Sequence, residues 1–316
     1  MGGAEKPPSV GRRRRAPRPA ESVAKLPEGP GTFAPRTVVI TGATSGIGEA
    51  ATHALARRAT TLVLVGRDPA RLATVAASLA AEPGAAAVRT HLADLSRLSE
   101  VRRLAGELTQ AHPQIEVLVN NAGAYYSRNE KTPEQNERTL ALNVLSPFLL
   151  TRLLQPSLAA ASPSRVLNVA SAAHTGAKLR WDDLDNQRKY SGFATYSRSK
   201  LALILLTHEL ARRWAPQRIA VNALHPGFVR TRFGHANPGA TAAVIRLMSR
   251  LFGISPERGA ETPVYLATSP QVEGVTGEYF VRRRAVRSSR ESYDDAAALR
   301  LWDVCSARTG LEPGAR

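Results

Sequence analysis

The 316-residue sequence contains little cysteine, no long apolar run and no spacing typical of a metal site. Its only cysteine, Cys305, excludes a disulfide within the chain and fits a reducing compartment. The seven histidines show neither an H-x-x-x-H spacing nor neighbouring cysteines, so we expect no metal site. No apolar run approaches the roughly 18 to 20 residues that a bilayer span needs. We expect no membrane span, no export signal after the arginines at 12–15, and a cytoplasmic location.

Lysine is also scarce, although the chain is strongly basic. The formal charge is +17, from 43 Lys and Arg against 26 Asp and Glu, and only six of the basic residues are lysine. Residues 1–31 hold seven basic and three acidic residues, so this segment supplies only +4 of the charge. Abundant arginine and alanine indicate the codon bias of a GC-rich genome rather than a binding patch. Because no aromatic interleaving or recognition motif accompanies the charge, we expect no nucleic-acid partner.

Composition divides the chain into an arm and one domain. Residues 1–33 are rich in proline, glycine and arginine and show no apolar period, which predicts a disordered basic arm. No change of composition interrupts residues 37–310, so residues 34–316 are expected to form a single domain.

The domain is organised around TVVITGATSGIG, residues 37–48. Its first four residues are all β-branched, which is typical of a strand buried on both faces. After Gly48 the apolar residues have helical spacing. A strand, a glycine turn and a helix N-terminus in this order form an anion site, because free N–H groups and the positive end of the helix dipole converge. Gly42 would allow the tight turn, Gly46 the approach of a pyrophosphate, and Gly48 close packing of helix and strand. Since Gly-x3-Gly-x-Gly differs from G-x-G-x-x-G, a loop of another α/β domain stays an alternative.

Strand-like and helix-like segments alternate along the rest of the chain. We expect strands at residues 37–40, 61–65, 87–92, 115–119, 165–170, 219–224 and 278–281, and long helices at 139–158 and 194–214. The alternation predicts an α/β fold with a Rossmann-type, doubly wound parallel sheet between two helical layers. Ligands of such sheets bind beyond the carboxyl ends of the strands. That edge would gather the glycine turn, Arg67, Asp94, residues 120–123, Ser171, Pro226 and Gly227.

Tyr196 and Lys200 lie four residues apart at the start of an amphipathic helix. Residues at this spacing share a helix face, with Cβ atoms about 5–6 Å apart. A phenol has a pKa near 10, and a neighbouring ammonium favours its ionised form, which brings it towards acid–base chemistry at neutral pH. Ser171, at the end of a strand, would then donate a hydrogen bond to a carbonyl oxygen. Taken alone, the pair of Tyr196 and Lys200 also fits an ordinary surface contact. Ser171 does not lie in a G-x-S-x-G elbow, which argues against a hydrolase.

The motifs occur in one order, which is TGATSGIG, NNAG at 120–123, Asn143, Ser171, Tyr196-x-x-x-Lys200 and Pro226-Gly227. This order resembles the short-chain dehydrogenase/reductase family, which has the same glycine spacing, and it covers residues 37–310. The segments NVASAAH, NALHPGFVRT and PVYLATSPQVEGVTGEYF are most similar to the retinol dehydrogenase and WW-domain oxidoreductase branch. Two features depart from that branch, because we expect neither an N-terminal membrane anchor nor a WW domain. The chain resembles a soluble bacterial member of the family.

The resemblance implies an oxidoreductase that interconverts an aldehyde or ketone and an alcohol. Tyr196 would be the general acid in reduction and the base in the reverse direction, while Lys200 would lower its pKa and hold the nicotinamide ribose. Ser171 would orient the substrate oxygen, and Asn143 would support a water chain that returns the proton. The resemblance also implies cofactor contacts from Gly42, Thr44, Ser45, Gly46, Ile47, Gly48, Arg67, Asp94, Leu95, Asn121, Ala122, Gly123, Tyr196, Lys200, Pro226, Gly227 and Thr231.

Arg67 favours NADP(H) as the cofactor. An NAD-selective site needs a carboxylate at the end of the second strand for the ribose 2′-hydroxyl, and here that place reads Gly66-Arg67. A guanidinium is a forked, permanently charged partner for a 2′-phosphate. Asp68, one residue further, is the competing carboxylate, and Arg67 as a solvated turn residue is the alternative.

The segments around the expected nicotinamide predict a bulky apolar carbonyl substrate. Phe193 and Phe228 would line its site together with Ile245, Leu247, Met248, Leu251 and Phe252, while Arg230, Arg232 and Arg246 favour a charged substrate instead. His174 would face either the substrate or solvent.

From the family we expect a homodimer or homotetramer formed through the helices at 139–158 and 194–214. The alternative function is a non-catalytic NADP-binding regulator with a nucleic-acid-contacting arm, against which the intact Ser171, Tyr196 and Lys200 argue.

Overall fold

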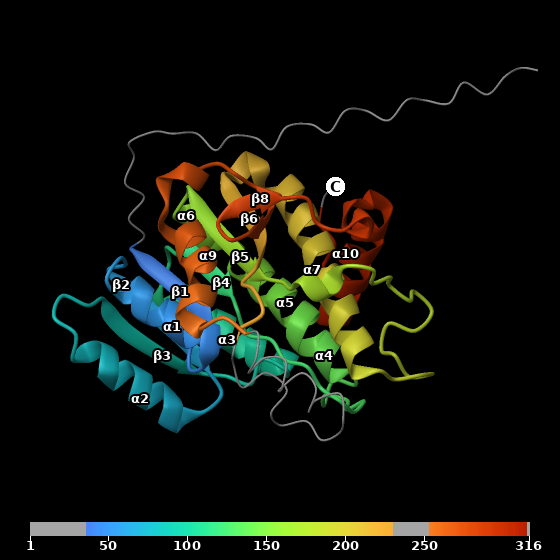
Figure 1. The fold of residues 1–316 in the computed structure, drawn as a ribbon, viewed down its shortest axis with the longest axis horizontal. Coiled ribbons are helices and arrows are strands. Elements are labelled where there is room, and N and C mark those ends of the chain that lie inside the picture. Colours follow the sequence, from blue (N-terminus) through green and yellow to red (C-terminus); the bar gives the residue numbers. More distant parts are fainter. Residues whose placement is uncertain (1–35, 230–252, 315–316) are drawn as a thin grey trace, which may run out of the picture.

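Strand β1 (Thr37–Thr41) lies inside an eight-stranded sheet in the computed structural model, which describes residues 36–229 and 253–314. Val38, Val39 and Ile40 are fully buried, because helices cover both faces of the sheet (Figure 1). Alternate residues of β1 belong to different cores, with Val39 in one and Val38 and Ile40 in the other. The predicted doubly wound α/β fold is therefore confirmed. The expected arm at residues 1–33 and Thr231 lie outside the described residues.

The sheet has the strand order β3-β2-β1-β4-β5-β6-β7-β8. Every neighbouring pair is parallel except β7 and β8. Because β1 pairs with β2 on one side and with β4 on the other, the order reverses there, and a crevice at the carboxyl ends of β1 and β4 is the expected ligand site. The remaining strands are β2 (Thr61–Gly66), β3 (Ala87–Leu92), β4 (Val117–Asn120), β5 (Ser164–Val169), β6 (Ile219–His225), β7 (Tyr279–Val281) and β8 (Arg284–Val286).

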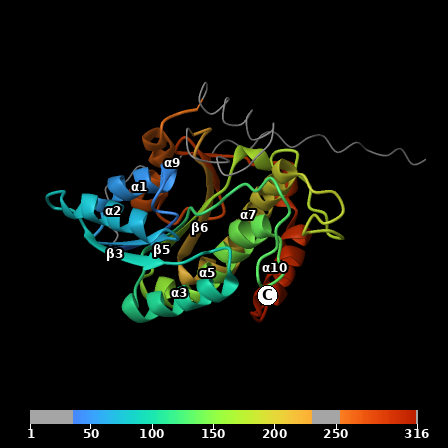
Figure 2. The ribbon, with the colours of Figure 1, turned by 90° about the horizontal axis from the view of Figure 1, so that it is seen from below.

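Two helical layers enclose the sheet, as Figures 1 and 2 show from perpendicular directions. One core lies between the sheet and α1 (Gly46–Ala56), α2 (Pro69–Ala80) and α9 (Pro256–Thr268). The other core lies under α3 (Leu98–Ala111), α5 (Ser146–Leu153), α6 (Gln155–Ala160), α7 (Gly192–Trp214) and α10 (Asp295–Thr309). Each helix buries one apolar face, and this burial is the main force that holds the layers on the sheet.

The helix expected at residues 139–158 is interrupted, so that expectation is wrong. A short α4 (Arg138–Leu140) runs into a π-helical turn at Ala141–Leu145, which is followed by α5 and then by α6. Leu154 separates the last two helices, and Pro156 in the first turn of α6 has no N–H with which to continue α5. The π-turn has functional weight because such turns recur at functional sites and this one contains Asn143.

Two polar side chains next to helix α3 and in the loop before α7 make specific contacts. Helix α3 begins at Leu98, and the Ser96 hydroxyl just before it donates to Asp94 Oδ1 at 2.8 Å. Asp185 is half-buried and accepts two hydrogen bonds from the Arg308 guanidinium, at 2.9 and 2.7 Å. The second contact joins positions 123 residues apart, so no local pattern indicates it.

Helix α10 covers α7, and this affects the expected oligomer. Residues 201–211 of α7 are all buried within the chain, and Trp302 of α10 packs edge-on against Phe148 of α5 with ring centroids 5.1 Å apart. The Arg213 guanidinium lies over the indole ring, with its central carbon 4.1 Å from the ring centroid. A second copy therefore finds no exposed run on the middle of α7, contrary to the expected interface. A homo-oligomer through other surfaces stays a prediction.

We predict that Trp302→Ala destabilises the fold by about 3–5 kcal/mol, because it removes a fully buried ring and leaves a cavity between α10 and α5. Urea unfolding followed by circular dichroism measures the loss. Leu92→Ala is the control, because the Leu92 side chain is 49% exposed and its loss should cost less than about 0.5 kcal/mol. Equal effects of the two changes would contradict the role given to α10.

Candidate active site

The turn after β1 opens towards the N-terminus of α1. Gly42 and Gly46 have φ angles of +65° and +55°, which residues with a Cβ rarely adopt. A Cβ on Gly48 would lie 2.1 Å from the Gly42 carbonyl oxygen, so α1 can approach the turn only with glycine there. Ser45 caps α1 in an extended conformation, but its hydroxyl makes no capping bond. The exposed Ser45 hydroxyl and the first N–H groups of α1 thus remain for an anion.

Asn121 holds the glycine turn in place from the neighbouring strand. Its side-chain amide donates to the carbonyl oxygens of Thr41 and Gly42, at 2.8 and 3.2 Å. In return, the Thr41 hydroxyl accepts the N–H groups of Asn121 and Ala122, each at 3.0 Å. The NNAG segment and the glycine turn therefore form one unit, with Gly123 exposed at its edge.

Tyr196 and Lys200 lie on one face of α7 and point towards the end of β5. The Lys200 amine donates to the Val169 carbonyl oxygen at 2.8 Å and lies 5.6 Å from the centre of the Tyr196 ring. The Ser171 hydroxyl is hydrogen-bonded to the Tyr196 phenol and also accepts the Ala173 N–H at 3.1 Å. The structure therefore brings these three predicted side chains together.

Burial dominates the protonation of this pair. It raises the pKa of the Tyr196 phenol to about 12, and the hydrogen bond from Ser171 lowers it by less. Burial also lowers the pKa of the Lys200 amine to about 8. Lys200 is not among the causes of the shift at Tyr196, so the expected lowering of the phenol's pKa by the amine stays a prediction. At neutral pH the phenol keeps its proton, which is the state that a general acid needs.

The π-turn directs Asn143 at the loop after Gly123. Its Oδ1 accepts the Ala124 N–H, while its Nδ2 donates to the Ala124 carbonyl and to Ser199 Oγ, all within 3.0 Å. A Cβ placed on Gly123 would lie 3.2 Å from both Asn143 Oδ1 and the Lys200 amine. Asn143 thus fixes the loop directly above the lysine, and its side chain has no spare donor.

A cavity of about 360 Å³ lies where these elements meet. Its polar lining consists of Asn121, Ser171, Tyr196, Lys200 and His225. The other lining residues are apolar or small, and they include Phe193 and Phe228, whose side chains are 50% and 46% exposed. The full lining is Ile47, Asn121, Gly123, Val169, Ala170, Ser171, Ala172, Ala173, Phe193, Tyr196, Lys200, His225, Pro226, Gly227, Phe228 and Val229.

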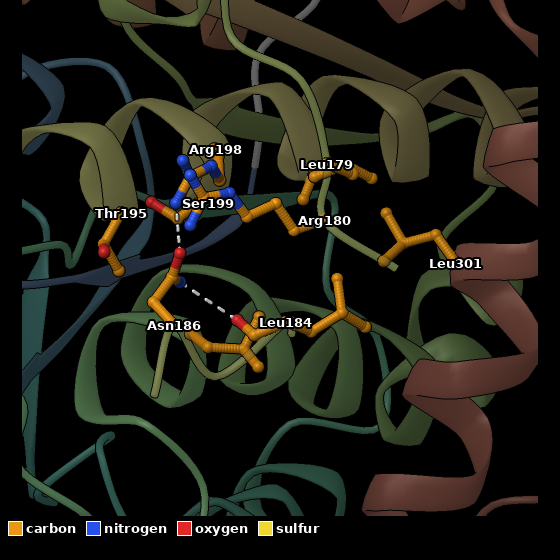
Figure 3. Close-up of a pocket in the computed structure, with 10 residues that line it drawn as sticks. Leu179, Arg180, Leu184, Asn186, Thr195, Arg198, Ser199 and Leu301 are labelled. Carbon is orange, nitrogen blue, oxygen red and sulfur yellow. Dashed lines mark hydrogen bonds between the residues drawn. The ribbon is translucent and has the colours of Figure 1, made fainter. Parts of the chain in front are cut away.

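The opposite side of α7 carries a second, much smaller cavity. Thr195, Arg198 and Ser199 line it together with Asn186 and Leu301, as Figure 3 shows. Its volume is about 20 Å³, which is room for about one water molecule. The first cavity, by contrast, is large enough for an organic substrate.

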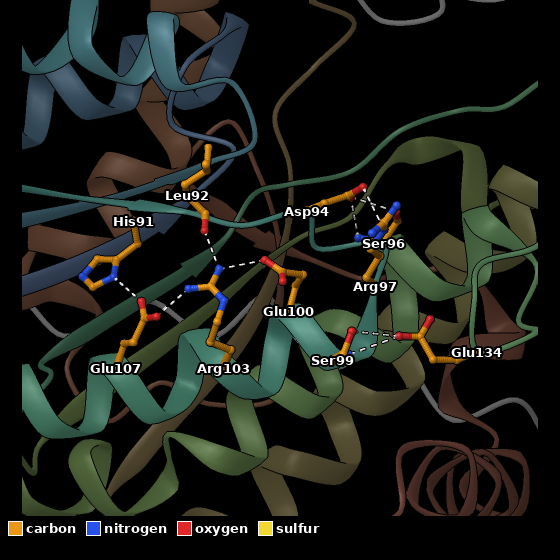
Figure 4. Close-up of polar contacts among 10 residues, drawn as sticks. All are labelled: His91, Leu92, Asp94, Ser96, Arg97, Ser99, Glu100, Arg103, Glu107 and Glu134. Carbon is orange, nitrogen blue, oxygen red and sulfur yellow. Dashed lines mark hydrogen bonds and ion pairs between the residues drawn. The ribbon is translucent and has the colours of Figure 1, made fainter.

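Arg67 and Asp94 lie apart from the cavity, at the ends of β2 and β3. Arg67 is exposed, whereas Asp68 caps α2 by accepting the Arg71 N–H at 3.1 Å. Asp94 accepts the N–H and the hydroxyl of Ser96 (Figure 4). Burial would raise the pKa of Asp94, but these two bonds and the nearby charge of Arg67 lower it. Figure 4 also shows that Arg103 joins Glu100 and Glu107 on α3, and none of these three residues lines the cavity.

Some predicted site residues have different surroundings, and some site residues were not predicted. The Leu95 side chain is buried in the core under α3, which leaves only its backbone to face a ligand, and Thr44 lies against Gly66. His174 is buried rather than facing substrate or solvent; its two ring nitrogens contact the Ser171 carbonyl and the Ser289 N–H. His225 lines the cavity and was missed, although its place before Pro226-Gly227, at a strand end, is a signal for it.

Comparison with known proteins identifies this arrangement. Residues 36–239 match the family model of short chain dehydrogenases. The chain belongs to the short-chain dehydrogenase family. It is 38% identical over 297 residues to human retinol dehydrogenase 14, which covers 89% of this chain and 88% of that protein. A Streptomyces sp. (strain C5) protein, provisionally named daunorubicin C-13 ketoreductase DnrU, is 40% identical over 276 residues, covering 87% of this chain and 93% of that one.

A solved structure adds a cofactor to the comparison. A Beutenbergia cavernae protein, provisionally described as an NAD(P)-dependent gluconate 5-dehydrogenase and solved with bound NADP at low occupancy, is 30% identical. It superposes with a TM-score of 0.64 and covers 80% of this chain and 97% of that one. This short-chain dehydrogenase is thus an NAD(P)-dependent oxidoreductase of carbonyl and alcohol groups in a small molecule, in the retinol dehydrogenase branch.

Two other kinds of feature, a membrane-spanning helix and a metal cluster, are absent from the part of the dehydrogenase that the structure describes. Across residues 36–229 and 253–314, no helix is both long and apolar enough to cross a bilayer. Over the same residues, no three His, Cys, Asp or Glu side chains gather as metal ligands would.

Lys200→Met tests the cost of the buried amine. Burial lowers the pKa of the amine from 10.5 to about 8, so its protonation opposes folding fully below about pH 8, and this cost disappears as the pH rises to 10.5. We therefore expect the wild-type dehydrogenase to gain thermal stability relative to Lys200→Met between pH 8 and 10, as scanning fluorimetry without cofactor would measure. Lys189→Met, at an exposed lysine, is the control and should show no such trend. A stability difference that stays constant with pH would contradict the assigned burial.

Proposed function

We propose that this dehydrogenase is an NADP(H)-dependent reductase of bulky apolar aldehydes or ketones, with Tyr196 as its general acid. The observation that carries the proposal is the hydrogen bond between Ser171 and Tyr196 at the wall of the large cavity, with Lys200 buried behind it. The mostly apolar lining supports a hydrophobic carbonyl compound as the substrate.

The residues around the glycine turn fit a dinucleotide. The open N-terminus of α1 suits a pyrophosphate, and Asn121 keeps the turn rigid. Ile47, Pro226 and Gly227 border the cavity beside Lys200, where a nicotinamide ring would be held. When bound, the nicotinamide would supply or accept the hydride.

The chain's own residues would then manage the proton and the carbonyl. Tyr196 would give its proton to the carbonyl oxygen as negative charge develops there, and Ser171 would hold that oxygen by a hydrogen bond. Lys200 would stabilise the resulting phenolate and contact the nicotinamide ribose. Asn143 would keep the loop over Lys200 in place, so that water can return the proton from solvent. In the reverse direction Tyr196 would act as the base.

Arg67 supports the choice of NADP(H). The competing carboxylate, Asp68, is engaged with the first turn of α2 and with Arg71, 3.3 Å from its Nε. It is therefore poorly placed to accept hydrogen bonds from a ribose, whereas the Arg67 side chain is exposed beside it. A permanently charged guanidinium at the end of β2 suits a 2′-phosphate.

The names of the relatives support an apolar substrate of some size. One relative is named for retinol and another for daunorubicin, and the exposed rings of Phe193 and Phe228 border the corresponding cavity here. The other expected wall residues, Ile245, Leu247, Met248, Leu251 and Phe252, and the arginines 230, 232 and 246 lie outside the described residues.

Tyr196→Phe should lower kcat/KM for carbonyl reduction by about 10²–10⁴-fold, since the ring still packs but carries no proton to give. The Kd for NADPH, measured by fluorescence titration, should change by less than about threefold. Tyr265→Phe is the matched control, because its hydroxyl donates to Gln271 Oε1 at 3.2 Å and Tyr265 does not line the cavity. Turnover near the wild-type rate in Tyr196→Phe would rule out the proposed mechanism. Cofactor binding without turnover of any carbonyl in the wild type would favour the regulator instead.

Arg67→Ala should weaken NADPH binding by about 10–100-fold, the loss expected for charged hydrogen bonds, and NADH binding by less than about threefold. The difference arises because only NADPH carries the 2′-phosphate. Calorimetric titration with each cofactor measures it, with Arg57→Ala as the control at an exposed arginine that follows α1. Tighter binding of NADH than of NADPH by the wild type would overturn the cofactor assignment.

A further inference from the structure

His225 is the polar residue of the large cavity that the proposed mechanism does not use. It ends β6, and the register of β5 and β6 pairs Val169 with Leu224, so His225 lies beside the strand end that leads into Ser171. Adjacent strands are about 4.8 Å apart. The imidazole and the Ser171 hydroxyl therefore border the same part of the cavity.

The other polar side chains of the cavity are already engaged. Asn121 donates to two carbonyl oxygens of the glycine turn, and Lys200 donates to Val169. Ser171 and Tyr196 contact each other and would hold the reacting oxygen. Among the described residues, His225 is thus the polar lining residue to which neither a side-chain hydrogen bond nor a step of the mechanism is assigned.

The two ring nitrogens of His225 differ. Nδ1 is enclosed and has no hydrogen-bond partner among the described residues, whereas Nε2 is not enclosed in this way. His174 is close enough to influence the ring, but both of its own nitrogens are occupied, so it offers Nδ1 no partner. Burial first, and then the charges of His174 and Arg282, lower the pKa of His225 to about 4. The ring is therefore neutral at pH 7 and carries one N–H and one acceptor nitrogen.

The proton of this neutral ring belongs on Nε2. A buried N–H without a partner costs more than a buried lone pair without one, because orphaned donors are the rarer case in folded proteins. An unprotonated Nδ1 therefore faces the enclosed side, and the Nε2–H is left for whatever enters the cavity.

We infer that the Nε2–H of His225 is a second donor for the substrate, and that the substrate is a ketone with another oxygen close to the reacting carbonyl. This inference rests on the proposed function and specifies its substrate class. With Ser171 and Tyr196 on the first oxygen and His225 one strand away, the second oxygen would sit on the neighbouring carbon or one carbon further. A 1,2-diketone and an α-hydroxyketone have this arrangement.

Benzil and deoxybenzoin form a matched pair of probes, since both have the 1,2-diphenylethane skeleton and only benzil has the second oxygen. We would measure kcat/KM for each with NADPH and with NADH, and compare the ratio of the two values in the wild type, His225→Phe and His225→Gln. Any difference in intrinsic reactivity between the probes cancels when this ratio is compared between variants. Phenylalanine keeps the ring without its N–H, while glutamine restores a neutral donor.

The ratio of benzil to deoxybenzoin should fall by about five- to tenfold in His225→Phe, the effect of one neutral hydrogen bond, and stay within about threefold of the wild type in His225→Gln. If deoxybenzoin is not turned over, loss of benzil turnover in the phenylalanine variant with retention in the glutamine variant supports the inference.

An unchanged ratio in His225→Phe, or equal losses of benzil turnover in both variants, would overturn the inference. Turnover of decanal or benzaldehyde by the wild type, but of neither probe, would overturn the substrate class while leaving the proposed function intact. Oxidation of NADPH and NADH with none of these carbonyl compounds would instead refute the proposed function itself.

Discussion

The site depends on a single buried amine. Lys200 is 4% exposed, and its one hydrogen bond within the described residues goes to the Val169 carbonyl at the end of β5. Burying an amine costs free energy, which is why its pKa falls. The burial of apolar side chains in the surrounding elements offsets this cost. Asn143 and its π-turn hold the loop at Gly123 above the amine, and Tyr196 lies one helical turn before it. The buried amine lowers the free energy of unfolding, and in return a cation lies beside the Tyr196 phenol.

The parts of this protein that local sequence patterns determine could be predicted. The run around β1, the three glycines and the Tyr-x-x-x-Lys spacing each follow from residues close in the chain, and the expected strands differ from the observed ones by a few residues at most. The π-turn could not be predicted, because the residues around Asn143 are good helix formers and the turn arises where the side chain meets Ala124. The contact of Asp185 with Arg308 depends on tertiary packing alone.

The pKa shifts in the site could not be predicted from the sequence either, because they depend on burial in the folded chain. Four-residue spacing places Lys200 beside Tyr196 but does not reveal that burial raises the pKa of the phenol and lowers the pKa of the amine. For the same reason the sequence does not distinguish His174 from His225. One histidine is fixed by two backbone groups, and the other keeps a ring nitrogen for the cavity. Near the C-terminus, β8 covers the edge of β7 and α10 covers α7, so the chain itself occupies two surfaces that a simpler sheet would leave exposed.

The proposed transfer of a hydride to a carbonyl carbon beside Tyr196 can be followed with deuterium. NADPH deuterated on both positions of the nicotinamide C4 would be incubated with aryl and long-chain aldehydes and ketones, and the alcohol products analysed by mass spectrometry. We expect one deuterium on the carbinol carbon of the product, and an initial rate of deuterium transfer that falls by about 10²–10⁴-fold when Tyr196→Phe replaces the wild type. Binding of NADPH without transfer of deuterium to any of these compounds, or equal transfer by both proteins, would contradict it.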